Sequence, residues 1–186
     1  MRIVVAITGA TGAVYGVAVL EALKSLGIET HLILSPWAVK TIELETDYTA
    51  AQVAELATVS FQPEDLTAGP ASGSFSHQGM IIAPCSMKTL ASIANGYADN
   101  LISRAADVTI KEKRPLVLLA RETPLNAIHL ENMLKLSRLG VVVMPPIPSF
   151  YQRPATIGDL IRQTAGRALE LLGIENDIFS RWNGPK

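Results

Sequence analysis

The chain alternates short runs that are apolar at almost every position with longer segments whose apolar residues recur at helical spacing. The apolar runs are Arg2–Thr8, Thr30–Leu34, Gly79–Ala83, Pro115–Ala120 and Val141–Met144. A strand that is apolar on both sides must be covered on both sides, which is typical of a parallel sheet packed between helices. The alternation therefore predicts an α/β fold whose parallel sheet is covered by helices on both faces.

The segments between the runs carry helix start and stop signals. Ser35 and Pro36 are typical of an N-cap followed by proline at the first helical position, and Gly27 and Gly140 are typical of residues just past a helix end. The predicted helices are Ala13–Leu26, Pro36–Glu45, Ser86–Asn95, Leu101–Lys113, Leu125–Leu139 and Thr156–Leu172, with a short helix opened by the capping box Thr49–Gln52. We find no internal repeat or linker, so residues 1–186 are predicted to form a single domain, a Rossmann-like (flavodoxin-like) three-layer sandwich.

Length and charge limit the classes of function. The 186 residues include 16 Lys and Arg against 17 Asp and Glu, a formal net charge of -1, which excludes nucleic-acid binding through a bulk basic field. No apolar stretch approaches the roughly 18 residues of a membrane span. Cys85 is the only cysteine, so no intrachain disulfide can form and a reducing compartment is expected. We therefore expect a cytoplasmic protein without a membrane or nucleic-acid partner.

Ligands of such sheets bind beyond the carboxyl ends of the strands, near the point where the strand order reverses. The first run ends in Gly9-Ala10-Thr11-Gly12 and a helix follows, so backbone N–H groups and the positive helix end face that crevice. The turn suits an anion or an electron-rich ring, although a tight turn with close helix packing would need the same glycines. Its spacing departs from G-x-G-x-x-G, and Ser35 stands where a dinucleotide site has an acid.

Two further helix starts follow predicted strands. Ser35 is either an ordinary N-cap or a hydroxyl for a phosphate or ribityl group. Ser86, Met87, Lys88 and Thr89 begin a helix after the third run and provide free N–H groups and two hydroxyls. Three helix starts at one crevice indicate a phosphate-bearing ligand with a ring, and a mononucleotide fits better than a dinucleotide.

Charged side chains near the strand ends are further candidates. Arg104, Asp107 and Lys111 share one helix face, where they form either a solvated salt-bridge ladder or part of a site. Arg121 and Glu122 directly follow an apolar run, and charges at that place usually point into a site. Later in the chain, four residues either line a site or occupy the surface: Tyr151, Arg153, Arg167 and Trp182.

Metal ligands lack the expected spacing. The aspartates are isolated, so no magnesium–diphosphate clamp is predicted, and the three histidines with Cys85 do not have the spacing of a structural zinc site. A phosphate must then be held by Arg, Lys and Tyr. Cys85 follows a predicted strand and is either a nucleophile or a buried cysteine.

Taken together, these residues resemble the UbiX family of flavin prenyltransferases over nearly the whole chain. The resemblance is carried by ordered motifs: Thr8–Gly12 with Tyr15-Gly16, Glu43–Thr46, Pro84–Ser86, Arg104–Val108, Lys111-Glu112, Arg121–Leu125, His129–Leu134, Phe150-Tyr151 with Pro154, and Arg181-Trp182. It implies a metal-independent alkyl transferase that moves a dimethylallyl group from dimethylallyl monophosphate to N5 and C6 of reduced FMN. The product, prenylated FMN, would serve a UbiD-type decarboxylase.

The resemblance also implies roles for single residues. The FMN contacts would be Gly9, Ala10, Thr11, Ser35, Ser86, Met87, Lys88, Thr89 and Arg121. The prenyl phosphate would be held by Tyr151 and Arg167, with Arg104, Lys111, Glu122 and Trp182 nearby. The catalytic candidates are Thr11, where the family commonly has serine, Glu122, Lys111 and Glu45. Related enzymes are often homododecamers with sites between subunits, so Glu45 and Trp182 would serve a neighbour's site.

Two other functions stay open. An FMN-dependent cysteine decarboxylase has the same fold, but that family carries an Asn-x-x-Met motif where this chain has Asn126-Ala127-Ile128-His129. A non-catalytic FMN carrier, or a regulatory subunit of a decarboxylase, would not need Lys111, Glu122, Tyr151 and Arg167.

Overall fold

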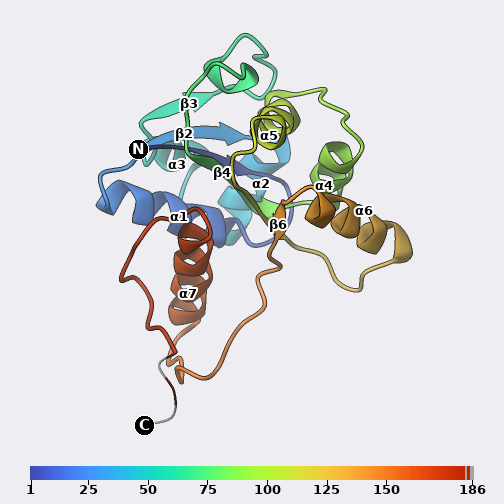
Figure 1. Cartoon of the computed structure of the whole chain (residues 1–186). Coiled ribbons are helices and arrows are strands. Elements are labelled where there is room, and N and C mark those ends of the chain that lie inside the picture. The colour runs from blue at the N-terminus through green and yellow to red at the C-terminus, as the bar shows by residue number, and fades with distance from the viewer. Residues whose placement is uncertain (183, 185–186) are drawn as a thin grey trace.

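The computed structural model describes residues 1–182 and 184 and contains a six-stranded parallel sheet between layers of helices (Figure 1). The strand order is β3-β2-β1-β4-β5-β6, so the order reverses between β1 and β4. The strands are β1 (Arg2–Ile7), β2 (Glu29–Leu34), β3 (Val59–Phe61), β4 (Gly79–Cys85), β5 (Leu116–Ala120) and β6 (Val142–Val143). The helices are α1 (Ala13–Ser25), α2 (Pro36–Glu45), α3 (Ala50–Ala54), α4 (Met87–Ala94), α5 (Leu101–Lys111), α6 (Ala127–Arg138) and α7 (Ile157–Glu170), with a 3-10 turn η1 (Gly69–Ala71).

The central strand β1 separates two hydrophobic cores. Its side chains alternate in direction, as in any strand, and all of Ile3–Ile7 is fully buried. Ile3, Val5 and Ile7 pack in the core under α1 and α7, whereas Val4 and Ala6 pack in the core under α4 and α5. The predicted three-layer sandwich with a parallel sheet is therefore confirmed.

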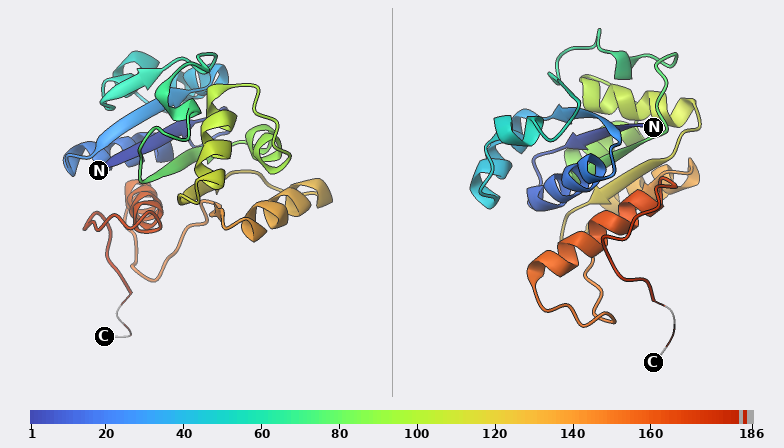
Figure 2. Two further views of the ribbon diagram at one scale, coloured as in Figure 1. Left: turned by 45° about the horizontal axis from the view of Figure 1, so that its top comes forward. Right: turned by 90° about the vertical axis from the view of Figure 1, so that its left-hand side faces the viewer.

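Residues 144–182, which we call the C-terminal layer, lie on the same face of the sheet as α1. Helix α7 packs on α1, and the segment between β6 and α7 together with the residues after α7 extends beyond the sheet and its helical layers (Figures 1 and 2). Residues 174–182, which we call the strap, follow α7. This part of the molecule lies away from the helices α4 and α5, which cover the opposite face of the sheet.

The structure differs from the sequence prediction at two strands. Strand β3 was not predicted, because it has only three residues and pairs only with β2, at the edge of the sheet. Strand β4 runs on through Pro84 to Cys85, where the prediction ended it at Ala83, and a register shift against β5 lies between Ile82 and Cys85. Cys85 is therefore fully buried inside a strand.

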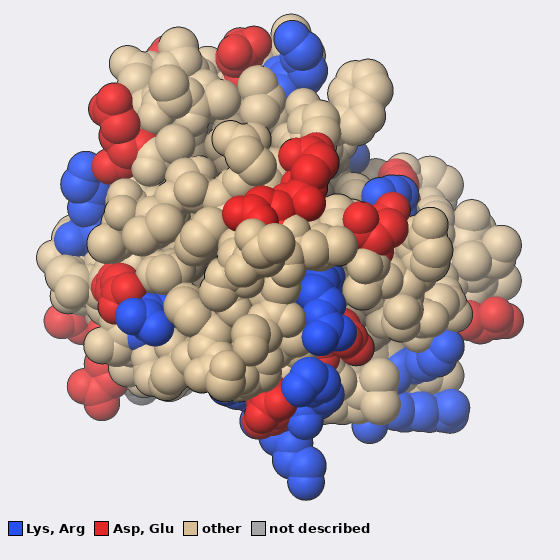
Figure 3. Space-filling model, turned by 90° about the horizontal axis from the view of Figure 1, so that it is seen from above, with Lys and Arg blue, Asp and Glu red and all other residues tan. Residues whose placement is uncertain are grey.

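Most of the face seen in Figure 3 is uncharged. Asp and Glu gather near its middle, and Lys and Arg lie mainly below them in that view. Among the described residues, no helix is long and apolar enough to span a membrane.

Candidate functional site

The turn after β1 is shaped by close contact with α2. A Cβ atom added to Gly9 would lie 2.2 Å from the Cβ atom of Trp37, so only glycine fits between the end of β1 and the start of α2. Gly12 has a φ of +99°, which L side chains rarely adopt. The structural reason given for the glycines, a tight turn with close helix packing, thus holds for this turn.

The N-terminus of α1 is occupied by a carboxylate from α2. Glu45 Oε2 accepts hydrogen bonds from the N–H groups of Gly12 at 2.7 Å and Ala13 at 3.0 Å. Gly12 has no side chain to cap the helix, and the negative charge of Glu45 interacts favourably with the positive helix end. Glu45, a predicted catalytic residue, therefore contacts the turn of its own chain.

The helix starts at Ser35 and Ser86 have the predicted caps. Ser35 Oγ accepts from Ala38 N at 3.1 Å, and Ser86 Oγ accepts from Thr89 N at 3.3 Å. Thr8, which is buried, fixes the second helix start, since its hydroxyl donates to Pro84 O and accepts from Ser86 N, both at 2.8 Å. In the first turn of α4, Thr89 N is capped by Ser86, and the N–H groups of Met87 and Lys88 have no intrahelical acceptor and are available to a ligand.

These helix starts line a cavity of about 600 Å³, which we call cavity A. Its lining includes five predicted FMN contacts: Gly9, Ser35, Ser86, Lys88 and Thr89. Lys88 is the cation among them, and its Nζ lies 3.9 Å from Asp99 Oδ2 across the cavity wall. Met87, a further predicted contact, turns its side chain toward the core under α4 and can offer only its backbone. Cavity A thus combines helix starts, hydroxyls and one ammonium group with the carboxylates of Glu64 and Asp99. The helix starts and hydroxyls offer hydrogen-bond donors to an anion at one side of the cavity.

A second cavity of about 480 Å³, cavity B, shares the glycine turn with cavity A. It is lined by Thr11, Gly12, Tyr15, Glu45 and Arg121, with Val14 and Pro146. Burial raises the pKa of Tyr15, and the guanidinium of Arg121 only partly offsets this effect. Ala10, also a predicted FMN contact, belongs to the turn between the two cavities. The predicted catalytic residues Thr11 and Glu45 therefore line the same cavity as Arg121.

Other predicted residues lie outside both cavities. Arg104 binds Asp107 at 2.8 Å and donates to Ala71 O at 3.1 Å, and Lys111 pairs with the neighbouring Glu112. Lys111 ends α5, whose start lines cavity A, and ten residues of helix place it about 15 Å farther along. Exposed Glu122 accepts a hydrogen bond from Thr123 N at 3.0 Å and lines neither cavity. Within one chain, the structure does not bring these residues to the glycine turn.

Two predicted residues, Tyr151 and Trp182, are in contact in the C-terminal layer, and Arg167 lies on the helix against which Tyr151 packs. The ring of Trp182 meets that of Tyr151 edge-on, with the ring centroids 5.5 Å apart. Tyr151 OH accepts a hydrogen bond from Gln163 Nε2 at 3.1 Å, and Arg167 lies one helical turn beyond Gln163 on α7 and pairs with Glu170. The segment that carries Tyr151 starts at cavity B, because Pro146 lines that cavity.

Sequence reasoning missed several residues of cavity A, among them Trp37 and Asn100. Trp37 lies against Gly9 and is largely exposed, and Asn100 caps α5 by accepting from Ile102 N and Ser103 N. Trp37 follows the Ser35-Pro36 helix start directly, and Asn100 precedes a helical segment, so both positions carried a usable signal. Cys85, in contrast, is excluded as a nucleophile, because it is fully buried and burial raises the pKa of its thiol. Among residues 1–182 and 184, no three His, Cys, Asp or Glu side chains are grouped to hold a metal ion.

Comparison with known proteins places this site in a family. The profile of the family described as Flavoprotein matches residues 1–167. The flavin prenyltransferase PAD1 of Saccharomyces cerevisiae, a mitochondrial protein, is 54% identical over 185 residues, covering 100% of this chain and 76% of the yeast protein. The chain belongs to the UbiX-like flavin prenyltransferase family. It spans most of the length of its relatives, and the resemblance read from the motifs is confirmed.

Solved structures agree with this assignment. AnUbiX (PadA1), crystallised with FMN and dimethylallyl pyrophosphate, is 54% identical and superposes with a TM-score of 0.98, covering 100% of this chain and 98% of that one. A dodecameric FMN-dependent UbiX-like protein of Escherichia coli O157:H7, described as a decarboxylase, is also 54% identical, with a TM-score of 0.97 over 99% and 100% of the two chains. The cysteine decarboxylase TvaF, at 20% identity and a TM-score of 0.66 over 93% and 98%, shares the fold alone.

Proposed function

We propose that this protein is a flavin prenyltransferase that transfers a dimethylallyl group from dimethylallyl monophosphate to N5 and C6 of reduced FMN. The observation that carries the proposal is the full-length match, at 54% identity, to a flavoprotein crystallised with FMN and a dimethylallyl donor. The two cavities beside the glycine turn give the match a physical basis. Each offers the chemistry that one part of a flavin mononucleotide requires.

Cavity A fits the phosphate and ribityl part of FMN. Ser86 and Thr89 provide hydroxyls, the first turn of α4 provides free N–H groups, and Lys88 provides a positive charge. Ser35 adds a hydroxyl from the neighbouring strand end. Gly9 lies against Trp37 with no room for a side chain, so the turn presents its backbone to cavity A. Gly9, Ala10 and Thr11 would then follow the flavin toward cavity B, where Arg121 contacts it.

The donor is assigned to side chains that favour an anion. When bound, reduced FMN supplies the nucleophile, and departure of the leaving group develops negative charge on the phosphate and positive charge on the prenyl carbon. Tyr151, Arg167, Arg104 and Lys111 would stabilise the phosphate, and the π-face of Trp182 the allylic cation. Thr11, Glu122 and Glu45 are the candidates for moving protons, with Glu45 already hydrogen-bonded to the turn that carries Thr11.

The separation of these residues supports a site shared between protomers. Lys111 lies at the far end of α5 from cavity A, so a donor site that uses it with Tyr151 needs a second copy of the chain. Apolar side chains are exposed on two helices, with Trp37 and Leu44 on α2 and Ile128, Leu130 and Leu134 on α6. Patches of this kind mark interfaces. We propose a homododecamer, the state described for the Escherichia coli relative.

The remaining parts of the proposal concern setting and partners. We propose that transfer needs no metal ion, because arginine, lysine and tyrosine are available to neutralise the phosphate. We propose a cytoplasmic location, in keeping with the single reduced Cys85. The product, prenylated FMN, would be handed to a UbiD-type decarboxylase.

The decisive experiment is a transfer assay followed by mass spectrometry of the flavin. Purified protein, reduced FMN and dimethylallyl monophosphate are mixed with a metal chelator, and the expected product is a flavin heavier by one prenyl group. Parallel reactions with dimethylallyl diphosphate and with oxidised FMN measure donor preference and the need for reduction. Recovery of FMN with unchanged mass from every reaction would overturn the proposal and favour a flavin carrier.

A further inference from the structure

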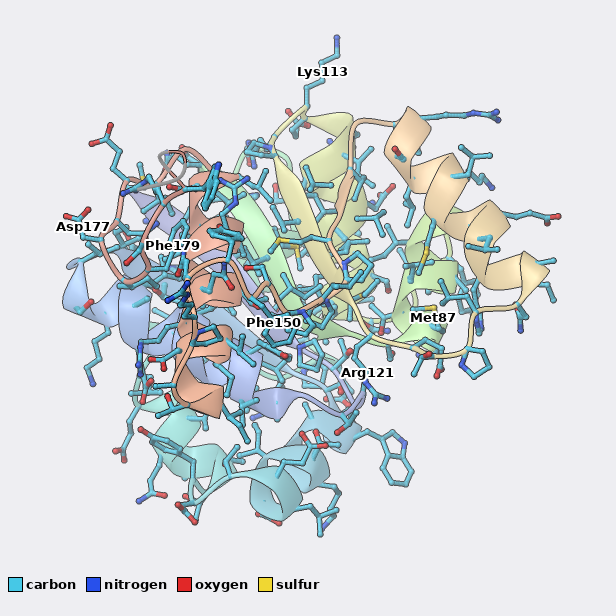
Figure 4. The ribbon with its side chains drawn as sticks, turned by 90° about the horizontal axis from the view of Figure 1, so that it is seen from below. Met87, Lys113, Arg121, Phe150, Asp177 and Phe179 are labelled. Atoms are coloured by element: carbon cyan, nitrogen blue, oxygen red, sulfur yellow. The ribbon has the colours of Figure 1, made fainter. Side chains whose placement is uncertain are left out.

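The strap packs closely against α7 at Gly166. A Cβ atom added to Gly166 would lie 2.4 Å from Phe179 Cδ1, so the strap occupies the space where α7 has no side chain. Buried Asn176 donates through Nδ2 to Gly166 O at 3.1 Å and to Ile174 O at 3.2 Å. In Figure 4, Phe179 and Asp177 lie on one side of α7 and Arg121 on the other.

Arg181 is the residue that ties the end of the strap to the helix. Its guanidinium donates through Nε to Glu170 Oε1 at 2.7 Å and through a terminal nitrogen to Asn176 O at 2.6 Å, lies 3.5 Å from Asp177 Oδ1, and faces the ring of Phe179 at 5.4 Å. The next residue is Trp182, which meets Tyr151. Arg181 therefore fixes where Trp182 can lie.

Glu170 is shared between two arginines. Arg181 binds one carboxylate oxygen and Arg167 binds the other. The Glu170 side chain is only 18% exposed, against 50% for Arg167 and 44% for Arg181. Burial raises the pKa of Glu170, but the hydrogen bonds from Arg167 and Arg181 lower it by more, so the carboxylate stays ionised. A carboxylate that is this well covered has to keep a cationic partner.

One face of α7 joins these contacts to the donor residues. Gln163, Arg167 and Glu170 stand at positions i, i+4 and i+7 and thus share that face. Gln163 binds Tyr151, Glu170 binds Arg167, and Arg181 binds Glu170. The orientation of Arg167 therefore depends on Glu170, and the charge that Glu170 presents to Arg167 depends on Arg181.

We propose that Arg181 is a positioning residue that frees Arg167 to bind the phosphate of the prenyl donor. With Arg181 present, Glu170 keeps a partner when Arg167 turns toward a phosphate. Without Arg181, the same movement would leave a half-buried carboxylate unpaired, so Glu170 would hold Arg167 back. The identity of the phosphate as the prenyl donor rests on the proposed function, whereas the competition between Glu170 and a phosphate for Arg167 does not.

The test compares three variants of the FMN-loaded protein: Arg181→Gln, Arg181→Gln with Glu170→Gln, and Arg162→Gln as a matched control. Arg162 is on the same helix and pairs with Asp159, whereas Glu170 pairs with Arg167 and Arg181. Arg162 lines a small pocket with strap residues 178–180, so its substitution also controls for a general disturbance of the strap. Calorimetric titration with inorganic phosphate and with dimethylallyl monophosphate gives the two dissociation constants. Steady-state assays give KM and kcat for the donor.

Arg181→Gln is expected to weaken binding of both phosphates and to raise KM about tenfold, with kcat within about twofold, because Glu170 then retains Arg167. The double variant is expected to recover to within about threefold of the unchanged protein, because the neutral amide introduced by Glu170→Gln cannot hold Arg167 by charge. Arg162→Gln should match the unchanged protein. A strap that only supports the fold predicts the reverse for the double variant, which would then be at least as impaired as Arg181→Gln.

Three results would overturn the proposal: no recovery in the double variant, equal losses of kcat and FMN affinity in Arg181→Gln, or no phosphate binding by the unchanged protein. Failure of the proposed function looks different. In that case the unchanged protein forms no prenylated flavin, while the phosphate titrations still report the competition for Arg167.

Discussion

The cavities at the strand ends and the C-terminal layer hold ligand-binding groups in two different ways. Around cavities A and B, the polar groups are backbone N–H groups and short hydroxyls fixed by the sheet, as when buried Thr8 binds both Pro84 and Ser86. In the C-terminal layer they are long side chains, Arg167, Arg181 and Tyr151, held by ion pairs and by one hydrogen bond. The first set cannot change partners without unfolding a helix end, whereas the second can.

This difference matches the two halves of the proposed reaction. A flavin acceptor must be held in one pose while its ring reacts, and rigid helix starts supply that at little entropic cost. A phosphate donor gains charge as it leaves, and arginines that exchange one anionic partner for another can follow that change. Substitutions in the two regions should therefore affect different measured quantities.

The largest effect is expected for Gly9→Ala. The added methyl group would lie 2.2 Å from Trp37 Cβ, a distance that forces the turn after β1 away from α2. We expect overpacking to lower the free energy of unfolding by about 1–3 kcal/mol and FMN affinity to fall by about 100-fold. Urea unfolding and flavin fluorescence titration measure the two quantities.

Gly158→Ala is the matched control for that substitution. Gly158 is in the first turn of α7, and its nearest neighbour would be the flexible end of Arg162 at 3.3 Å. This variant should keep its FMN affinity and its stability. If Gly9→Ala bound FMN as tightly as the unchanged protein, the turn would not be part of the flavin site.

The second effect concerns the other region. Arg167→Ala removes a predicted phosphate ligand from α7, and charge-assisted hydrogen bonds are among the stronger ones. We expect kcat/KM for dimethylallyl monophosphate to fall about 30-fold while the FMN dissociation constant changes less than about twofold. Arg162→Ala on the same helix should leave both unchanged. Equal losses of FMN binding and turnover in Arg167→Ala would place this residue in the flavin site instead.

Features encoded by neighbouring residues could be predicted from the sequence. The N-cap at Ser35, the capping box at Thr49 and the helix starts at Ser86 and Thr156 follow from residues at most three positions apart, and the structure has all of them. The predicted helix starts located the ends of the preceding strands, and the residues at those ends include part of the lining of cavity A. This is why five of the residues that line cavity A could be predicted as site candidates.

Features that join distant residues could not be predicted in the same way. Glu45 reaches Gly12 across 33 positions, Trp37 meets Gly9 only because two strands are adjacent, and the strap lies on α7 because Gly166 leaves room for it. Strand β3 exists only through its pairing with β2. In each case the stabilising contact comes from tertiary packing, and no local pattern specifies it. The C-terminal layer consists mainly of such contacts. The sequence therefore indicated individual candidate residues there, but not the contacts between them.

The smallest effect tests how α7 itself is held. Asp159 accepts hydrogen bonds through Oδ2 from Thr156 N at 2.8 Å and Ala155 N at 3.0 Å, and these bonds, with those from the Thr156 hydroxyl and Arg162, hold the pKa of Asp159 below its ordinary range. A carboxylate whose pKa is depressed by folding stabilises the folded state above its unfolded pKa, and this contribution is lost as the pH falls through the folded value. Asp159→Asn should therefore lower the melting temperature slightly at pH 7. The difference in melting temperature between the variant and the unchanged protein should shrink below about pH 4 and vanish once Asp159 is protonated in the unchanged protein.

The control for this helix start is Asp47→Asn, because Asp47 is exposed and the substitution makes the same change of charge without the bonds that Asp159 accepts. The difference in melting temperature between Asp47→Asn and the unchanged protein should not follow the pH dependence expected for Asp159→Asn. Helix α7 carries Gln163, Arg167 and Glu170, so the donor affinity of Asp159→Asn separates two ways of holding the binding face. A drop in affinity that accompanies the loss of the cap would show that the start of the helix and the position of Arg167 are coupled. Unchanged affinity would show that Glu170 and the strap hold Arg167 independently of the helix start.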